Sequence, residues 1–72
     1  PADVAAQLAA ADVELLGGSV APAFGRLVEL IRLTSGAERE QARVRLLELF
    51  ETVEPNDPAV LKARRDLVSA LF

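Results

Sequence analysis

The sequence predicts an all-α domain of four helices, arranged as two antiparallel helical hairpins. Hydrophobic residues make up 51% of the 72 residues and are chiefly Leu, Ala and Val, with three Phe and no Trp or Tyr. This composition suits helix packing better than β-strands. Apolar residues recur at helical spacing in four segments, and turns rich in Gly or Pro separate the segments. The length is enough for one domain, close to the lower limit for a single apolar core.

The first helix is predicted from about Val4 to Leu16. Asp3 can accept hydrogen bonds from the free amides of the first turn, as an N-cap does. Gly17 and Gly18 end the helix, because glycine enters left-handed conformations at little cost. The stripe predicted to face inward is Val4, Leu8, Ala11 and Leu15.

The second helix is predicted to follow Ser19 as its N-cap. Pro22 falls in its first turn, where the missing amide proton costs little. Gly25 weakens the helix by about 1 kcal/mol relative to Ala, and we expect a close approach between helices to be the reason for it. The stripe predicted to face inward is Val20, Phe24, Leu27 and Ile31.

The next break contains Ser35 and Gly36 and allows two interpretations. Gly36 is a typical C-cap for the second helix, whereas Ser35 and Glu38 have the spacing of a capping box that opens the third. The third helix spans about Ala37 to Val53. Its inward side is predicted to carry Ala42, Leu46, Leu49, Phe50 and Val53.

Residues 54–58, Glu-Pro-Asn-Asp-Pro, form the clearest turn signal in the chain. Asp57 as N-cap and Pro58 at the first helical position predict a fourth helix that runs to Phe72. The residues predicted to face inward are Val60, Leu61, Leu67, Val68 and Leu71. Those predicted to face outward are Lys62, Arg65, Asp66 and Ser69.

The two halves of the chain resemble each other at an offset of 40 residues. The offset superposes identical residues at six of the sixteen positions from 13 to 28: Val13 and Val53, Glu14 and Glu54, Val20 and Val60, Ala23 and Ala63, Leu27 and Leu67, Val28 and Val68. Helical-hairpin repeats have periods of this size and function by presenting a surface. The sequence therefore predicts one helical-repeat domain over residues 1–72, with hairpins at about 1–36 and 37–72. The first and third helices would line one side, and the second and fourth the other.

Particular stretches resemble a known family. Residues 18–23, followed by Leu27 and Leu30, resemble the second helix of a tetratricopeptide repeat (TPR). Residues 42–50, the turn at 56–58 and the ending at 63–72 resemble the C-terminal TPR region of YbbN-type co-chaperones of the thioredoxin family. The aromatic positions and closing proline of a regular TPR are absent and the offset exceeds the usual 34, so the resemblance implies a degenerate TPR pair.

The resemblance also implies the setting of the domain. In that family a thioredoxin-like domain precedes the repeats, and cell redox chemistry, if any, lies in that domain. The protein would be bacterial and cytoplasmic, with chaperone machinery or client polypeptides as partners. The chain begins at Pro1 and has no Met, and we expect it to be a fragment of a longer protein.

Composition argues against several other classes. The sequence has no His, Cys or Tyr and no phosphate-binding glycine loop, so it offers no candidate catalytic, cofactor-binding or metal-binding residues and no cofactor. A formal charge of −3 argues against nucleic acid as a partner. No apolar run reaches the roughly 20 residues that cross a bilayer, so no membrane association is expected.

Candidate partner-binding residues lie in the second half. Val44 and Leu47 fall outside the inward stripe of the third helix; they form either a contact surface or ordinary exposed apolar positions. Arg43, Arg64 and Arg65 form either a solvated, salt-bridged face or a patch for an acidic or C-terminal carboxylate peptide. The end of the fourth helix adds two apolar candidates, Leu71 and Phe72.

Two charges interrupt apolar stripes. Asp12 lies between Leu8 and Leu16, and Arg64 lies among apolar residues of the fourth helix. An unpaired buried charge is costly. Each charge therefore either reaches solvent at a boundary, or the two meet as an ion pair that fixes the contact between the first and fourth helices.

These observations predict a non-catalytic protein-interaction module that binds client or chaperone surfaces. The alternative is a structural or dimerisation domain that organises the attached thioredoxin-like domain, with the chain itself as a homodimer. A small-molecule-binding helical bundle is a third option, for which the sequence shows no pocket signal.

Overall fold

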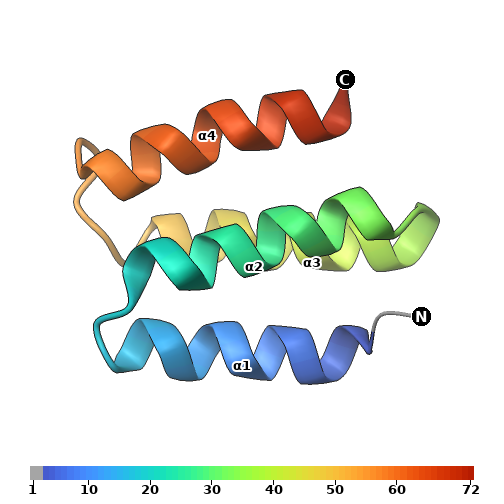
Figure 1. The fold of residues 1–72 in the computed structure, drawn as a ribbon, viewed down its shortest axis with the longest axis horizontal. Helices are drawn as coiled ribbons and strands as arrows, with labels where there is room; N and C mark the ends of the chain where they lie inside the picture. The colour runs from blue at the N-terminus through green and yellow to red at the C-terminus, as the bar shows by residue number, and fades with distance from the viewer. Residues whose placement is uncertain (1–2) are drawn as a thin grey trace.

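The computed structural model describes residues 3–72 and shows four α-helices in that range. They are α1 (Val4–Leu16), α2 (Val20–Leu33), α3 (Gly36–Phe50) and α4 (Pro58–Leu71). Consecutive helices run antiparallel (Figure 1). The predicted all-α fold of four helices is confirmed.

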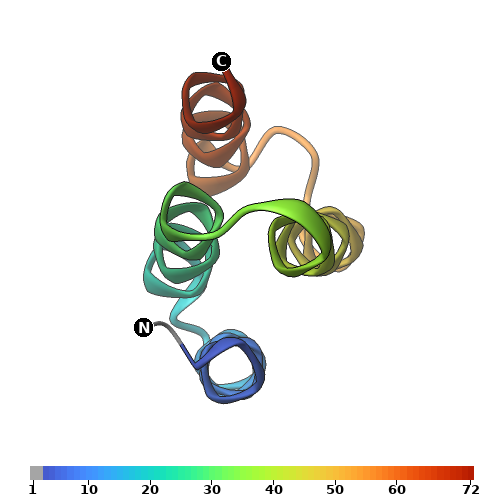
Figure 2. The ribbon, with the colours of Figure 1, turned by 90° about the vertical axis from the view of Figure 1, so that its right-hand side faces the viewer.

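Helix α2 occupies the centre of the molecule and packs against each of the other three helices. Helices α1 and α4 lie on opposite sides of α2, and α3 lies to one side of that row (Figure 2). The contacts of α1 with α3 and of α2 with α4 agree with the predicted sides of the repeat. Helices α3 and α4, although consecutive, each pack mainly on α2 and not closely on one another.

The core consists of buried apolar side chains, and α2 contributes the largest share. The buried residues are Val4, Leu8, Ala11, Ala23, Phe24, Leu27, Val28, Leu30, Ile31, Ala42, Leu46, Phe50, Val60, Ala63 and Leu67. At its centre the rings of Phe24 and Phe50 meet edge to face, with centroids 5.0 Å apart, an arrangement favoured by their quadrupoles. The predicted stripe of α2 omitted Ala23, Val28 and Leu30, because a single stripe does not describe a helix covered on three sides.

Two predictions of burial on α4 are wrong. Leu61 and Val68 were expected to face inward, but their side chains are 45% and 59% exposed, while Ala63 is buried. The reason is that only α2 covers α4 closely, so the helix buries one narrow stripe. Leu61 and Val68 each follow a residue of that stripe, and one residue along a helix turns the side chain by about 100°.

The ends of α1 and α4 form as their cap residues predict. The amide of Ala6 donates to Asp3 Oδ1 at 3.1 Å, and the amide of Ala59 donates to Asp57 Oδ1 at 2.8 Å. Pro58 occupies the start of α4. Ser19 stands at the N-cap position of α2 without a side-chain cap bond.

Helix α3 ends at Phe50, earlier than the predicted Val53. The amides of Glu51, Thr52 and Val53 donate to carbonyls three residues earlier. Such bonds tighten the chain and satisfy the last carbonyls without continuing the α-helix.

The break between α2 and α3 follows the second predicted alternative in part, because Ser35 occupies the N-cap position of α3. Gly36, with φ +58°, is the first residue of α3 and not the cap of α2, and Ser35 makes no side-chain cap bond. Instead, Arg39 of α3 reaches back to the end of α2. Its Nε donates to the carbonyl oxygens of Ile31 at 3.2 Å and Thr34 at 3.0 Å. A basic side chain at a helix C-terminus satisfies carbonyls that have no partner in the helix.

The expected reason for Gly25 is also wrong. Gly25 is exposed, and a Cβ placed on it would meet no atom within 4 Å. No neighbouring helix therefore requires a glycine at this position.

We expect Gly25→Ala to raise the free energy of unfolding by about 1 kcal/mol, because alanine has the higher helix propensity and fits the open space. Gly18→Ala serves as the contrasting variant. Gly18 has φ +86°, so alanine there is strained and should lower stability. Urea denaturation followed by circular dichroism measures both; a Gly25→Ala protein no more stable than the parent would contradict this explanation.

Candidate functional site

Asp12 on α1 pairs with Arg45 on α3. The alternative in which Asp12 pairs with Arg64 is therefore wrong, whereas the Asp12 side chain is 43% exposed and Arg64 is exposed, as the other alternative expected. Arg45 Nη1 lies 2.6 Å from Asp12 Oδ2, and Arg45 Nε lies 3.7 Å from Glu48 Oε1. The prediction failed because it assumed a contact between the first and fourth helices, which lie on opposite sides of α2 (Figure 2). Arg64 instead places its guanidinium 5.0 Å from the centre of the Phe50 ring, within the range of a cation–π contact.

The candidate residues of α3 divide between two sides of that helix. Arg45 faces α1, and residues two positions away on a helix point to the opposite side. Arg43 and Leu47 therefore lie on the side of α3 away from α1. Leu47 is half-buried and packs against the core, contrary to the prediction that it lies outside it. Val44 is 41% exposed.

The candidates of α4 divide in the same way. Arg64 and Leu71 are seven residues apart and share one side of the helix, the side on which Arg64 meets Phe50 of α3. Leu71 is half-buried against the core. Arg65 follows Arg64 by one position, and the fully exposed Phe72 follows Leu71. Both therefore turn away from that side.

The structure thus brings four candidates to the facing sides of α3 and α4: Arg43, Leu47, Arg64 and Leu71. Arg43, Leu47 and Phe50 have the spacing of one helical stripe, and Phe50 is the residue that Arg64 contacts. We call this set the α3–α4 side. Val44, Arg65 and Phe72 do not belong to it.

Most basic residues of the second half already have partners inside the molecule. Arg43 bonds to Glu40 at 2.5 and 2.9 Å, and Lys62 bonds to Asp66 at 2.5 Å. Arg39 caps α2, and Arg45 pairs with Asp12. These contacts favour the salt-bridged face over a patch that receives an acidic peptide.

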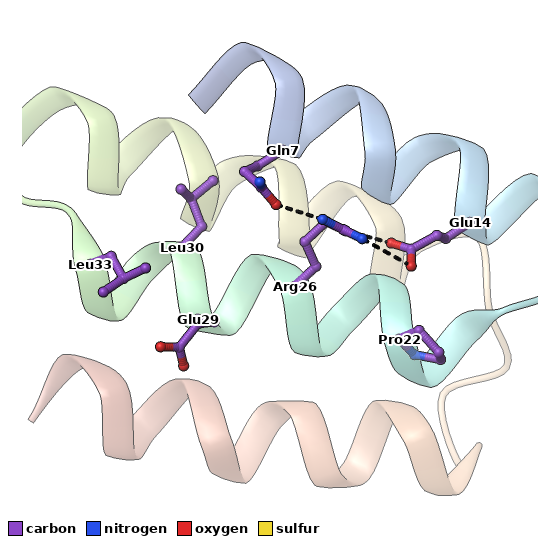
Figure 3. Close-up of a pocket in the computed structure, with 7 residues that line it drawn as sticks. All are labelled: Gln7, Glu14, Pro22, Arg26, Glu29, Leu30 and Leu33. Atoms are coloured by element: carbon purple, nitrogen blue, oxygen red, sulfur yellow. Dashed lines mark hydrogen bonds and ion pairs between the residues drawn. The ribbon is translucent and has the colours of Figure 1, made fainter. Parts of the chain in front are cut away.

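A groove of about 760 Å³ runs along the contact between α1 and α2. Its lining residues are Gln7, Glu14, Pro22, Arg26, Glu29, Leu30 and Leu33. Arg26 points from α2 between two side chains of α1 (Figure 3). Its Nε and Nη2 donate to the two carboxylate oxygens of Glu14 at 2.7 and 3.3 Å, and its Nη1 donates to Gln7 Oε1 at 2.7 Å.

These bonds change the ionisation of both partners. The hydrogen bond from Arg26, reinforced by its charge, lowers the pKa of Glu14 below its ordinary value, and the same bond raises the pKa of Arg26. A two-bond guanidinium–carboxylate pair fixes geometry as well as charge. Because its charge is balanced, Arg26 serves to hold α1 on α2 and is not a free anion-binding group. Sequence reasoning missed this pair, since its members lie twelve residues apart across a turn.

The described residues offer no metal site: no group of three or more Asp or Glu side chains within residues 3–72 could hold an ion. None of the helices in this range combines the length and the hydrophobicity needed to cross a bilayer.

The sequence matches the family described as tetratricopeptide repeat over residues 1–72. The chain belongs to this family. The TPR resemblance is therefore confirmed; membership supports protein–protein interaction, and domains of this family are generally non-catalytic. We refer to this chain as the TPR module.

The module is similar to proteins from mycobacteria. It is 51% identical over 70 residues to "Uncharacterized protein Mb1359" from Mycobacterium bovis and to "Uncharacterized protein Rv1324" from Mycobacterium tuberculosis. Each alignment covers 97% of this chain and 23% of the relative, so the TPR module spans about a quarter of the length of these curated relatives. No solved structure matches the chain.

We expect the Glu14–Arg26 pair to make the stability of the TPR module depend on pH. The pKa of Glu14 is lowered in the folded state, so the pair stabilises the fold above the unfolded pKa and loses this effect as pH falls through the folded pKa. The melting temperature of Glu14→Gln should therefore lie below that of the parent at neutral pH. The difference should shrink as pH drops below the ordinary glutamate pKa of 4.5.

Thermal unfolding between pH 7 and pH 3 measures this difference. Glu38→Gln is the matched control, because the Glu38 side chain is exposed and makes no ion pair among residues 3–72. If the melting temperatures of the parent and Glu14→Gln differ by the same amount at every pH, the Glu14–Arg26 pair does not cause the pH dependence of stability.

Proposed function

We propose that the chain is the protein-interaction module of a thioredoxin-like co-chaperone in the bacterial cytoplasm, where it binds client polypeptides or the chaperone machinery. The observation that carries the interaction role is the TPR family match over the whole chain. The co-chaperone setting is supported by the YbbN-like stretches at residues 42–50, 56–58 and 63–72.

The mycobacterial relatives are consistent with this setting. The module accounts for 23% of their length, so in those proteins it is one part of a longer chain. A thioredoxin-like domain would occupy part of the remainder. The repeat would either bring bound polypeptides to the chemistry of that domain or dock on the domain itself.

The surface proposed to bind is the α3–α4 side. Because α3 and α4 pack on α2 rather than closely on each other, Leu47 and Leu71 remain only half-buried. On α4 the exposed Leu61 and Val68 continue the side that carries Arg64, at spacings of three and four residues. The result is an apolar strip that contains two guanidinium groups, a combination suited to apolar segments of non-native chains.

The remaining candidates lie at the margins of this strip. Val44 adds an exposed apolar group on α3, and Arg65 and Phe72 add charge and an aromatic ring on the outer side of α4. Aromatic and Arg side chains contribute a large share of binding energy in many interfaces.

The alternative, a dimerisation domain, is favoured by one observation on α4. The exposed residues Leu61 and Val68 are seven residues apart, which places them in one seam as in paired helices, and the exposed Phe72 follows at the end of α4. In a dimer this seam would pack against its copy.

We expect Val68→Glu to weaken binding of a fluorescently labelled, permanently unfolded polypeptide about fivefold or more, because it places a charge in the apolar strip. Reduced, carboxymethylated α-lactalbumin is a suitable probe, with fluorescence anisotropy as the measurement. Val68 is mostly exposed, so the melting temperature should not change. Leu33→Glu, at an exposed apolar residue of α2, is the control and should bind as the parent does.

Equal affinity of Val68→Glu and the parent would refute the proposed surface. Sedimentation velocity on the same proteins distinguishes polypeptide binding from the alternative role in dimerisation. A monomer is expected, whereas a tight dimer that Val68→Glu dissociates would assign this face to dimerisation.

The co-chaperone setting makes a separate prediction about the longer relatives. We expect the part of the mycobacterial proteins outside the TPR module to contain a thioredoxin fold, because the resemblance places such a domain ahead of the repeats. Structure determination of a full-length relative tests this, and a remainder without that fold would leave the interaction role standing but remove the co-chaperone assignment.

A further inference from the structure

The α1–α2 turn and the α3–α4 turn lie at the same end of the molecule (Figure 1). A second groove is lined by residues beside these two turns. Its volume is about 790 Å³. The residues that line it are Asp12, Leu15, Leu16, Val20, Leu49, Thr52, Val53, Glu54 and Asp57. They come from three helices and the turn after α3, and none belongs to the α3–α4 side.

The floor of this end groove is apolar. Leu15, Val20, Leu49 and Val53 are half-buried, with one side packed against the core. Leu16 stands at the edge and is 89% exposed. Single exposed apolar residues are ordinary, but five that converge on one concave surface are typical of a binding site.

The groove is bordered by acidic groups. Asp12, Glu54 and Asp57 line it. Of these three, Asp12 is the one that pairs with Arg45, which also lies 3.7 Å from Glu48. Asp57 accepts a hydrogen bond from the amide of Ala59, and Glu54 makes no ion pair with any residue from 3 to 72. The stretch between Arg45 and Lys62 contains four acidic residues and no basic one. Arg64 of α4 lines a neighbouring pocket together with Glu51 and Glu54, and the acidic groups at this end still outnumber the basic ones.

We propose that the end groove docks a short amphipathic segment of a partner protein, in which Leu- or Phe-like side chains are flanked by Lys or Arg. The apolar side chains would cover the floor, and the basic ones would lie against Glu54 and Asp57. Complementary charge selects such a partner over an acidic one, since like charges across an interface are repelled. This inference rests on the proposed role in protein binding but concerns a site separate from the α3–α4 side.

Nuclear magnetic resonance titration of the ¹⁵N-labelled chain tests the proposal with two synthetic peptides. One is a short helical peptide of leucines and lysines, and the other has glutamate in place of every lysine. The lysine peptide should shift amide resonances within residues 12–20 and 49–57, and more salt should weaken its binding, because screening reduces attraction between exposed charges. The glutamate peptide should leave these resonances unchanged.

Two substitutions test the two components of recognition. Leu16→Ser removes apolar surface and Glu54→Lys reverses the charge; both side chains are exposed, so the fold should be kept. Together they should weaken binding of the lysine peptide about tenfold or more. Leu33→Ser and Glu38→Gln, which alter exposed residues of the same types outside the groove, should have no effect.

Several outcomes would overturn the proposal: equal binding of both peptides, shifts confined to Val44, Leu61 and Val68, or full affinity in the double variant. Resonances of the groove that depend on protein concentration without peptide would show that a second copy fills it, and would also refute the assignment. Failure here is distinguishable from failure of the proposed function, because unfolded-polypeptide binding at the α3–α4 side is measured independently through Val68→Glu.

Discussion

Helix α2 carries apolar side chains on three of its sides, and the rest of the fold follows from the need to cover them. Six of its fourteen residues are buried apolar side chains, among them Phe24, Leu27 and Ile31. Burying one large apolar side chain is worth about 1.5–3 kcal/mol, so leaving any of these sides in water would be expensive for a chain of this size. Helices α1, α3 and α4 each cover one side. Their positions around α2 then decide which charged residues can meet.

The parts of the fold that depend on neighbouring residues could be predicted from the sequence. The caps at Asp3 and Asp57, the proline at the start of α4 and the glycine break after α1 act within a few residues of each helix end, so local pattern contains the needed information. The contacts of Asp12 with Arg45, Glu14 with Arg26 and Arg39 with the end of α2 depend on which helices become neighbours. A helical wheel gives the direction of a side chain but not the neighbour it meets, which is why Arg64 was assigned the wrong partner.

The same distinction applies to the candidate sites. The residues proposed from sequence included four that the structure gathers on the α3–α4 side. Their residue types could be recognised in one helix at a time, but their burial could not: Leu47, expected outside the core, packs against it. The end groove could not be found in that way. Its floor combines Leu15 and Val20 with Leu49 and Val53, and each of these residues, considered within its own helix, belongs to the ordinary inward stripe.

The unequal attachment of the helices has a consequence for how the molecule opens. Helix α1 is held by α2, by α3 and by the two interhelical ion pairs of Asp12 and Glu14. Within residues 3–72, α4 packs closely on α2 alone, with the stacking of Arg64 on Phe50 as a further tie. Partial unfolding begins where few contacts must be broken. Separation of α4 from α2 would therefore break neither interhelical ion pair of α1, and it would uncover Val60 and Leu67.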